Sequence, residues 1–399
     1  MPDLVSWILP FLFVLTFVVT VHELGHYWAG RAFNLVIDRF SIGFGRPILK
    51  WTDRQGVRWQ IGWLPVGGYV RFAGDDNAAS AVPDQADLDE MKARILAHND
   101  PSALRRFYHF APVWQRAVIA VAGPLANFAL AAVLFSLLLA IFGEQRLPAV
   151  VERIAPGSVA EQAGFRSGDV FKTMDGREVA DFQALAQYVS MRPGDPIDFI
   201  MLRDGREVAI TAAPRLVMVE DSIAGRQKVG QLGIGYPGRY EHVSYTIPQA
   251  IAGGPAKMAR VVGITLDYLG RLITGRISAD QISGVIGIAK VSDGVAKASI
   301  EAASTAPEAA INLFNGMLLV VALISVSVGI LNLLPIPTLD GGHLLFYAYE
   351  AVARRPLAAG VQAAGYRLGL ALLLGFMLFA VWNDLQRYNL FNFLGGLFS

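Results

Sequence analysis

The sequence contains no cysteine and few charged residues for its length. Without cysteine the chain can form neither a disulfide nor a thiolate metal site, so a bound metal would need His, Asp or Glu ligands. Only 17% of the 399 residues are charged, whereas 54% are hydrophobic. This composition is too apolar for an ordinary soluble protein of this size, and it indicates a membrane protein.

Clusters of basic residues are also missing. The formal net charge is +1, and the Lys and Arg residues are scattered along the chain. A nucleic-acid-binding protein needs grouped cations to neutralise phosphates. We therefore expect no nucleic-acid partner.

Four apolar stretches are long enough to cross a bilayer, which takes about 20 helical residues. The stretches predict transmembrane helices within residues 1–34, 113–143, 309–342 and 356–384. A cleaved signal peptide is the alternative interpretation of the first stretch. Met1 to Leu4 carry no positive charge, however, and no small-residue cleavage site precedes His22, which argues against that alternative.

The positive residues predict an orientation for these helices. Several of them flank the loop between the first two stretches, and three more lie in the short loop before the fourth. Because cytoplasmic loops are enriched in Lys and Arg, both loops are predicted to be cytoplasmic. The long segment between the second and third stretches, together with both termini, is then predicted to lie outside. The basic residues concerned are Arg31, Arg39, Arg46, Lys50, Arg105, Arg106, Arg116, Arg354, Arg355 and Arg367.

The first apolar stretch contains the sequence His22-Glu23-Leu24-Gly25-His26. On a helix, two residues four apart lie on one face, close enough to ligate a single ion. In the His-Glu-x-x-His pattern the imidazoles bind zinc and the Glu takes a proton from the metal-bound water. Ionisable groups inside an apolar span are costly and usually mark a functional site. We therefore predict one Zn²⁺ per chain, with His22 and His26 as ligands and Glu23 as the catalytic base.

A catalytic zinc needs a third protein ligand, and Asp340 is the best candidate. It follows Pro335 and Pro337, which prevent a regular helix, and precedes two glycines that permit a tight turn. The first and third spans run in the same direction, so their C-terminal ends reach the same, cytoplasmic side. His343 and Glu350 are the rival candidates for this third ligand.

These residues resemble the site-two protease family of M50-type zinc metalloproteases, specifically its bacterial RseP-like branch. The resemblance rests on the His22 to His26 motif, the Asn332 to Gly342 segment with its pattern NxxPxPxLDGG, and three further segments. Those are Phe40 to Lys50, Pro65 to Val70, and Ala122 to Phe128. The resemblance to this family implies an intramembrane protease of the bacterial inner membrane that acts on membrane proteins with a transmembrane segment.

The resemblance also implies roles for residues outside the metal motif. Asn332 is expected to hold the substrate backbone. Within the cytoplasmic loop 35–112, the strand-like stretches are expected to form a membrane-associated β element that guides substrate as an added strand. Asn127 has two open interpretations, a substrate contact or a buried hydrogen-bonding group between helices. The segment from Asp75 to Asp100, rich in Ala, Asp and Glu, predicts a solvated loop.

Between the second and third spans the composition becomes that of a soluble domain. Short β-prone runs at Ala149 to Ile154 and Ile197 to Leu202 are separated by turn signals, and a short helix is expected at Phe182 to Met191. The segment 148–238 resembles the PDZ domains of bacterial proteases, which bind extended peptides or proteins by strand addition. Residues 239–308 predict an amphipathic, membrane-associated segment, so the chain has room for one such domain.

The predicted fold class is thus a polytopic α-helical membrane protein with four transmembrane helices, a membrane-associated β element and an inserted, exported PDZ domain of the α+β class. The predicted function is zinc-dependent proteolysis of membrane proteins. Two alternatives come from other classes. One is a non-catalytic membrane scaffold or chaperone with a structural metal, against which the presence of Glu23 argues. The other is a metal or proton transporter, which would need polar residues through the full depth of the bilayer.

Overall fold

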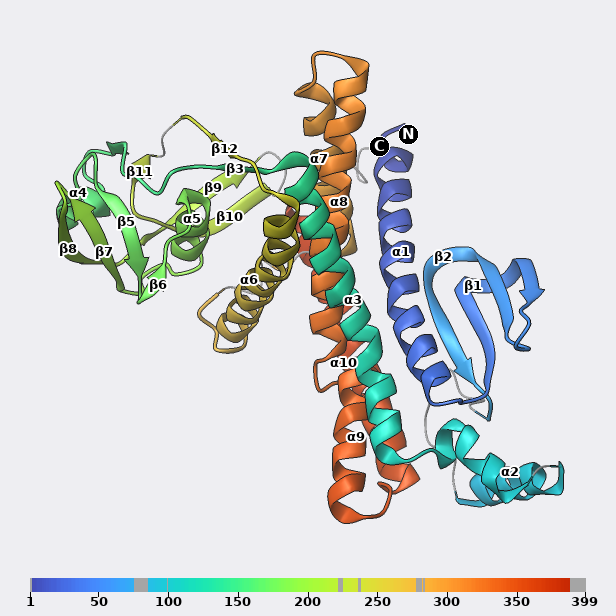
Figure 1. Ribbon diagram of the computed structural model, residues 1–399. Coiled ribbons are helices and arrows are strands. Elements are labelled where there is room, and N and C mark those ends of the chain that lie inside the picture. The colour runs from blue at the N-terminus through green and yellow to red at the C-terminus, as the bar shows by residue number, and fades with distance from the viewer. Residues whose placement is uncertain are drawn as a thin grey trace, which may run out of the picture. The chain divides into compact units, whose positions relative to one another are not determined.

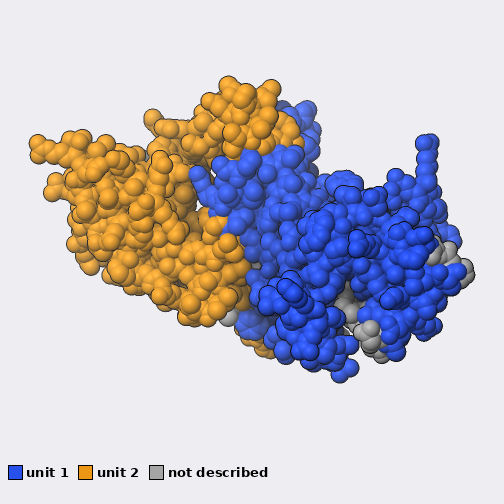
Figure 2. Space-filling view, turned by 60° about the horizontal axis from the view of Figure 1, so that its bottom comes forward, with its two compact units in different colours: residues 1–135, 254–262, 292–380 blue, residues 136–253, 263–291, 381–399 orange. Residues whose placement is uncertain are grey.

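The computed structural model describes residues 2–74, 85–98, 100–221, 225–235, 238–277, 282 and 284–387. The chain divides into two compact units (Figure 2), each of which is described separately below. Unit 1 comprises residues 1–135, 254–262 and 292–380, and unit 2 comprises residues 136–253, 263–291 and 381–399.

Four long helices dominate the structure (Figure 1): α1 (Pro2–Ala32), α3 (Val113–Phe142), α8 (Ala306–Asn332) and α10 (Ala359–Arg387). Among the described residues, four helical segments are long and apolar enough to cross a membrane, and one lies in each of these helices. This confirms the prediction of a mostly helical chain with four candidate membrane-spanning helices. Each of these helices carries exposed large apolar side chains, among them Phe17, Val133, Leu319 and Leu372, as lipid contact requires.

The third of these helices is shorter than the sequence predicted. We expected a span within 309–342, but α8 ends at Asn332, and Asp340 begins a separate helix, α9 (Asp340–Ala353). Pro335 and Pro337 lie in the connection, where each removes a backbone donor that a continuous helix would need. The two prolines indicated this break, but the apolar run that continues past Asn332 extended the predicted span too far.

A small antiparallel sheet packs beside α1 in unit 1 (Figure 1) and consists of β1 (Ile37–Thr52) and β2 (Arg58–Phe72). Ile42 pairs with both Gly68 and Ile61, so the first half of β1 lies between the two halves of β2. Phe40 is fully buried in a core that also includes Tyr27 of α1. The predicted strands in this region are confirmed.

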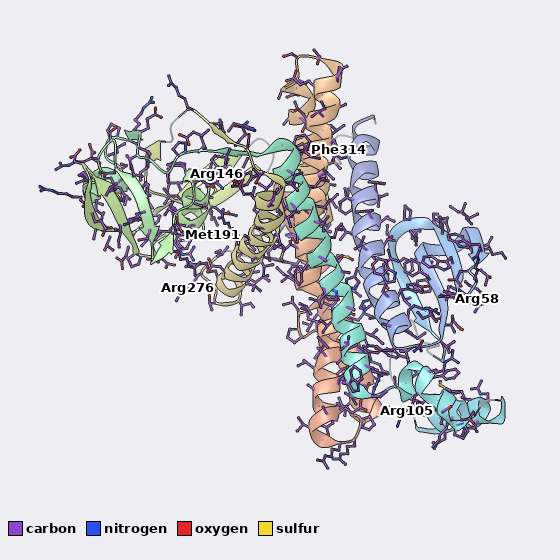
Figure 3. The ribbon with its side chains drawn as sticks, viewed as in Figure 1. Arg58, Arg105, Arg146, Met191, Arg276 and Phe314 are labelled. Atoms are coloured by element: carbon purple, nitrogen blue, oxygen red, sulfur yellow. The ribbon has the colours of Figure 1, made fainter. Side chains whose placement is uncertain are left out.

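Arg58 lies on the side of the sheet that faces away from α1 (Figure 3). Where residues 44–49 pair with residues 61–64, the apolar side chains of the sheet are unusually open: Ile48 is 72% exposed, Trp63 is 61% exposed and Leu49 is 55% exposed. Large exposed apolar patches of this kind mark interaction surfaces.

The segment 75–100 differs from the solvated loop that the sequence predicted. Its described part forms helix α2 (Gln85–His98), and residues 75–84 and 99 lie outside the described residues. Ile95 is buried, and Met91, one turn earlier, is partly buried. This short apolar face stabilises the helix by packing. Two 3₁₀ helices, η1 (Pro101–Arg106) and η2 (Tyr108–Phe110), then lead into α3.

Unit 2 contains a four-stranded antiparallel sheet with the order β6-β5-β7-β8 and one main hydrophobic core. Helices α4 (Val159–Ala163) and α5 (Phe182–Ser190) accompany it. The prediction of a strand at Ile197 to Leu202 and a helix at Phe182 to Met191 is confirmed by β7 and α5. The sheet strands are β5 (Val170–Met174), β6 (Arg177–Glu178), β7 (Ile197–Arg203) and β8 (Arg206–Ala212).

Three pairs of further strands complete unit 2. The strand predicted at Ala149 to Ile154 forms only in part, as a single bridge from Val150 to Val170 followed by β4. The pairs are β3 (Glu144–Arg146) with β12 (Glu241–Val243), β4 (Arg153–Ile154) with β11 (Ile234–Gly235), and β9 (Arg215–Asp221) with β10 (Gly225–Gln231).

The segment predicted to be amphipathic folds into α6 (Ile247–Ile273) and α7 (Val285–Glu301). The C-terminal part of α6 is tied to the small sheet domain by two ion pairs, Arg192 with Asp267 at 2.6 Å and Arg271 with Asp195 at 2.7 Å. Asp384, which is fully buried, accepts hydrogen bonds from the backbone of Gly284 and Gly287 at the start of α7.

Candidate metal centre

Helix α1 presents His22 and His26 on one face, one helical turn apart. Their Nε2 atoms are 3.1 Å apart, and the two rings meet edge to face. His22 is only 6% exposed. Two imidazoles are therefore brought together with their Nε2 atoms converging, as the spacing predicted.

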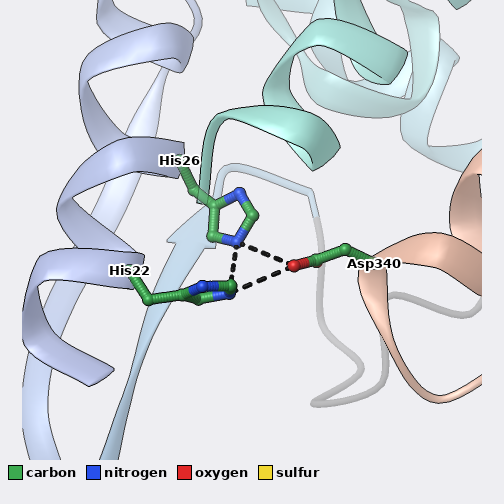
Figure 4. A group of neighbouring side chains, drawn as sticks. All are labelled: His22, His26 and Asp340. Carbon is green, nitrogen blue, oxygen red and sulfur yellow. Dashed lines mark hydrogen bonds and ion pairs between the residues drawn. The ribbon is translucent and has the colours of Figure 1, made fainter. Parts of the chain in front are cut away.

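Asp340, at the start of α9, completes the group (Figure 4). Its Oδ2 atom lies 3.1 Å from Nε2 of His22 and 3.5 Å from Nε2 of His26. The turn before it requires the two glycines that follow. A Cβ atom on Gly341 would lie 2.3 Å from the carbonyl oxygen of Leu334, and one on Gly342 would lie 2.3 Å from that of Ile336. The close backbone packing of this turn places the carboxylate opposite α1.

The three side chains fit a zinc ion. Their ligand atoms all lie within 4.8 Å of one another, and Oδ2 of Asp340 is buried without a hydrogen-bond partner of good geometry. A buried, unpartnered carboxylate oxygen beside two imidazole nitrogens is costly unless a cation satisfies it. Two imidazoles and one carboxylate are also a usual ligand set for catalytic zinc, with a fourth position left open.

Helix α3 backs the two histidines from the other side. Nδ1 of His26 is 2.7 Å from the carbonyl oxygen of Ile119, and Nδ1 of His22 is 3.3 Å from the amide of Asn127. Gly123 lies midway between these two partners, and a Cβ atom there would be 2.3 Å from Nε2 of His26. Residues 119, 123 and 127 are one turn apart, so a single face of α3 lines the histidine pair.

Glu23 lies next to His22 but outside the ligand group that the described residues form. Its Oε2 atom accepts a hydrogen bond of 3.1 Å from the backbone N–H of Val70 in β2. The edge of the sheet thus holds this carboxylate, which leaves it beside the group of His22, His26 and Asp340 without being part of it.

The remaining candidates from the sequence lie apart from the group of three. Asn332 ends α8, and its amide donates to the carbonyl of Val328 in the same helix. Of the rival third ligands, Glu350 pairs with Arg116 at 2.7 Å. The ring of His343 is 3.3 Å from the hydroxyl of Tyr366. The structure therefore brings Asp340, and neither rival, to the histidines.

Two partners of the histidines were missed by sequence reasoning. Ile119 contributes only a backbone carbonyl, which no residue pattern identifies. Gly123 had a signal, because a glycine followed by a proline is unusual inside an apolar helix. Asn127 was considered, and its place next to His22 favours the interpretation as a buried hydrogen-bonding group between helices.

Comparison with known proteins agrees with this chemistry. The model of peptidase family M50 matches residues 10–376. The Metalloprotease MmpA of Caulobacter vibrioides is 52% identical over 390 residues, which cover 97% of this chain and 97% of that protein.

Two further relatives carry the name "Putative zinc metalloprotease". The protein from Mesorhizobium japonicum is 40% identical, and the match covers 95% of this chain and 98% of the relative. The protein from Agrobacterium fabrum is 37% identical, and the match covers 96% of each. With four apolar helices and a converging group of two histidines and an aspartate, the chain belongs to peptidase family M50 and is a multi-pass membrane metalloprotease that uses zinc.

Proposed function

We propose that this protein is an intramembrane protease that hydrolyses peptide bonds in or near the transmembrane segments of other membrane proteins. In this proposal His22, His26 and Asp340 hold one zinc ion and Glu23 is the catalytic base. The observation that carries the proposal is the convergence of three ligand atoms within 4.8 Å at the end of an apolar helix.

The bound zinc would polarise the scissile carbonyl and make a water molecule more acidic at neutral pH. Glu23 would take the proton from the attacking water and later deliver it to the leaving amine. The hydrogen bond from Val70 supports this role, because it fixes the carboxylate next to the ligands without using both of its oxygens.

The substrate would be held in extended form near this centre. Asn332 is the proposed contact to the substrate backbone. The β1–β2 sheet is the proposed membrane-associated element to which the substrate adds as a strand. Its exposed Ile48, Leu49 and Trp63 support contact with the bilayer, since such side chains are rarely left in water as a group.

Residues 148–238 are proposed to form a single PDZ domain with a peptide or protein ligand, and residues 239–308 a membrane-associated segment. The small sheet, the short α5 helix and their common core support the domain assignment. The proposed location is the bacterial inner membrane. There the PDZ domain and both termini face outward and the metal centre lies near the cytoplasmic side, as in regulated intramembrane proteolysis.

Matched substitutions at two carboxylates test the metal site. Asp340→Asn should lose zinc during purification and lose cleavage of single-span substrates in detergent, because an amide oxygen is a poor zinc ligand. Glu350→Gln makes the same chemical change at the rival carboxylate and should keep both zinc and activity, since the amide oxygen still accepts from Arg116. Zinc content is measured by atomic absorption. Full zinc in Asp340→Asn would overturn the assignment.

A further inference from the structure

Asn127 lies in the middle of α3, and it is completely buried. Its amide nitrogen is 3.3 Å from Nδ1 of His22, and its amide oxygen has no hydrogen-bond partner among the residues that the structure describes. Its own backbone carbonyl accepts a hydrogen bond of 2.8 Å from the hydroxyl of Ser325 in α8. The bond from Ser325 holds the backbone of Asn127, and the side chain has one polar atom on the histidine and the other unused.

The arrangement suits His22 in the absence of metal. Nε2 of His22 then carries the ring proton and points at Asp340, 3.1 Å away. Nδ1 is left as an acceptor, and the amide N–H of Asn127 fills that need. Both ring nitrogens then have a polar neighbour that suits them, Asp340 for Nε2–H and the Asn127 amide for Nδ1.

Zinc binding reverses what Nδ1 of His22 needs, from a hydrogen-bond donor to an acceptor. A ligand nitrogen must offer its lone pair to the metal, so the proton of His22 has to reside on Nδ1 when Nε2 ligates. Nδ1–H then needs an acceptor at the same place. The only change required at Asn127 is a half-turn of its amide group, which brings the unused oxygen to that position.

We infer that Asn127 is a positioning residue for zinc, whose amide oxygen accepts the Nδ1–H of His22 and holds that ring in the ligating tautomer. The inference rests on the ligand set of the proposed function. His26 has the equivalent support from the carbonyl of Ile119, 2.7 Å from its Nδ1 atom. One face of α3 thus orients both histidines. The full burial of Asn127 also argues against a direct contact with substrate.

The test is the zinc affinity of the full-length protein in detergent, measured by competition with a chromophoric chelator. Asn127→Leu keeps the approximate size but has no acceptor, and it should weaken zinc binding roughly 10- to 100-fold, as loss of an outer-shell partner does. Asn127→Asp supplies a carboxylate acceptor and should bind zinc within about threefold of wild type. Ser325→Ala removes only the bond to the Asn127 backbone and should leave the affinity unchanged.

Thermal unfolding in excess chelator accompanies each titration, so that a packing defect is seen separately from a zinc defect. Wild-type affinity in Asn127→Leu would overturn the inference, and so would an equal loss in Asn127→Leu and Asn127→Asp. If Asn127→Leu does not fold, Asn127→Asp decides alone, and a loss of more than about tenfold contradicts the role. Failure of the wild type to bind zinc would instead count against the proposed function itself.

Discussion

At the residue scale, Gly123 leaves the space that the metal centre needs. A Cβ atom at this position would lie 2.3 Å from Nε2 of His26 and 2.9 Å from Cε1 of His22, and neither histidine can retreat without leaving its ligating position. The absence of a side chain here is as necessary to the centre as the presence of the ligands.

Gly123→Ala should therefore reduce zinc affinity by roughly tenfold or more, since it displaces a ligand directly. Gly375→Ala is the matched control, because that glycine is also helical and has nothing within 4 Å of the added atom. Chelator competition measures both variants. Equal affinities in the two variants would show that the close approach of α3 has no bearing on the metal.

The convergence of His22 and His26 could be predicted because helix geometry alone brings positions 22 and 26 together. The prediction of Asp340 as the third candidate ligand needed two further arguments, the topology of the spans and the lack of cysteine. The structure places Asp340 with His22 and His26. The contribution of Ile119 could not be predicted, and the signal at Gly123 did not reveal its role, because both depend on how α3 packs against α1. That packing brings together residues about 100 positions apart in the sequence.

At the scale of elements, the local sequence pattern predicted the strands β1, β2 and β7 and the helix α5. It failed where tertiary packing or a break in the helix determines whether an element forms and where it ends. The prolines after Asn332 indicated a break, but the apolar run that continues past them placed the end of the predicted span ten residues too late, at 342 instead of 332. Helix α2 was hidden by its charged composition, since Ile95 is one of few apolar anchors. The PDZ assignment of unit 2 stays a prediction.

An ion pair in unit 2 ties Asp169, the residue directly before β5, to Arg203 at the end of β7. Asp169 is 1% exposed and accepts two hydrogen bonds of 2.7 Å from Arg203, as well as one from the backbone of Arg166. Burial raises the pKa of Asp169, but these hydrogen bonds outweigh it and hold the pKa below its ordinary value.

In the unfolded chain the Asp169 carboxyl group has an ordinary pKa of about 4. Because folding lowers this pKa, the charged carboxylate stabilises the fold fully above about pH 4, and the stabilisation is lost as the pH falls further. Amide hydrogen exchange in β5 and β7, corrected for intrinsic rates, should therefore accelerate below about pH 4. Asp169→Asn should destabilise the sheet by about 3 kcal/mol at neutral pH and flatten this acid response.

Asp204→Asn, an exposed change in the turn between β7 and β8, serves as the control and should keep the wild-type response. If Asp169→Asn shows the same acceleration in acid as the wild type, another group is responsible.

At the scale of the whole molecule, the proposed topology can be tested cleanly because the chain has no native cysteine. Two single-cysteine variants, Arg206→Cys and Gln55→Cys, serve as probes. Position 206 is exposed on a strand of unit 2, and position 55 is exposed in the turn between β1 and β2. In intact spheroplasts, a membrane-impermeant maleimide should label Cys at 206 and should label Cys at 55 only after permeabilisation. The reverse pattern would invert the orientation, and labelling of both would contradict a bilayer between them.

The central claim is that the group formed by His22, His26 and Asp340 is a catalytic zinc centre with Glu23 as its base. The most direct measurement compares the wild type with Glu23→Gln, following cleavage of a panel of single-span substrates together with bound zinc. The account predicts zinc in both proteins and cleavage by the wild type alone. Equal cleavage by both, or none by either despite bound zinc and substrates that a related protease cuts, would contradict it in favour of a scaffold or a transporter.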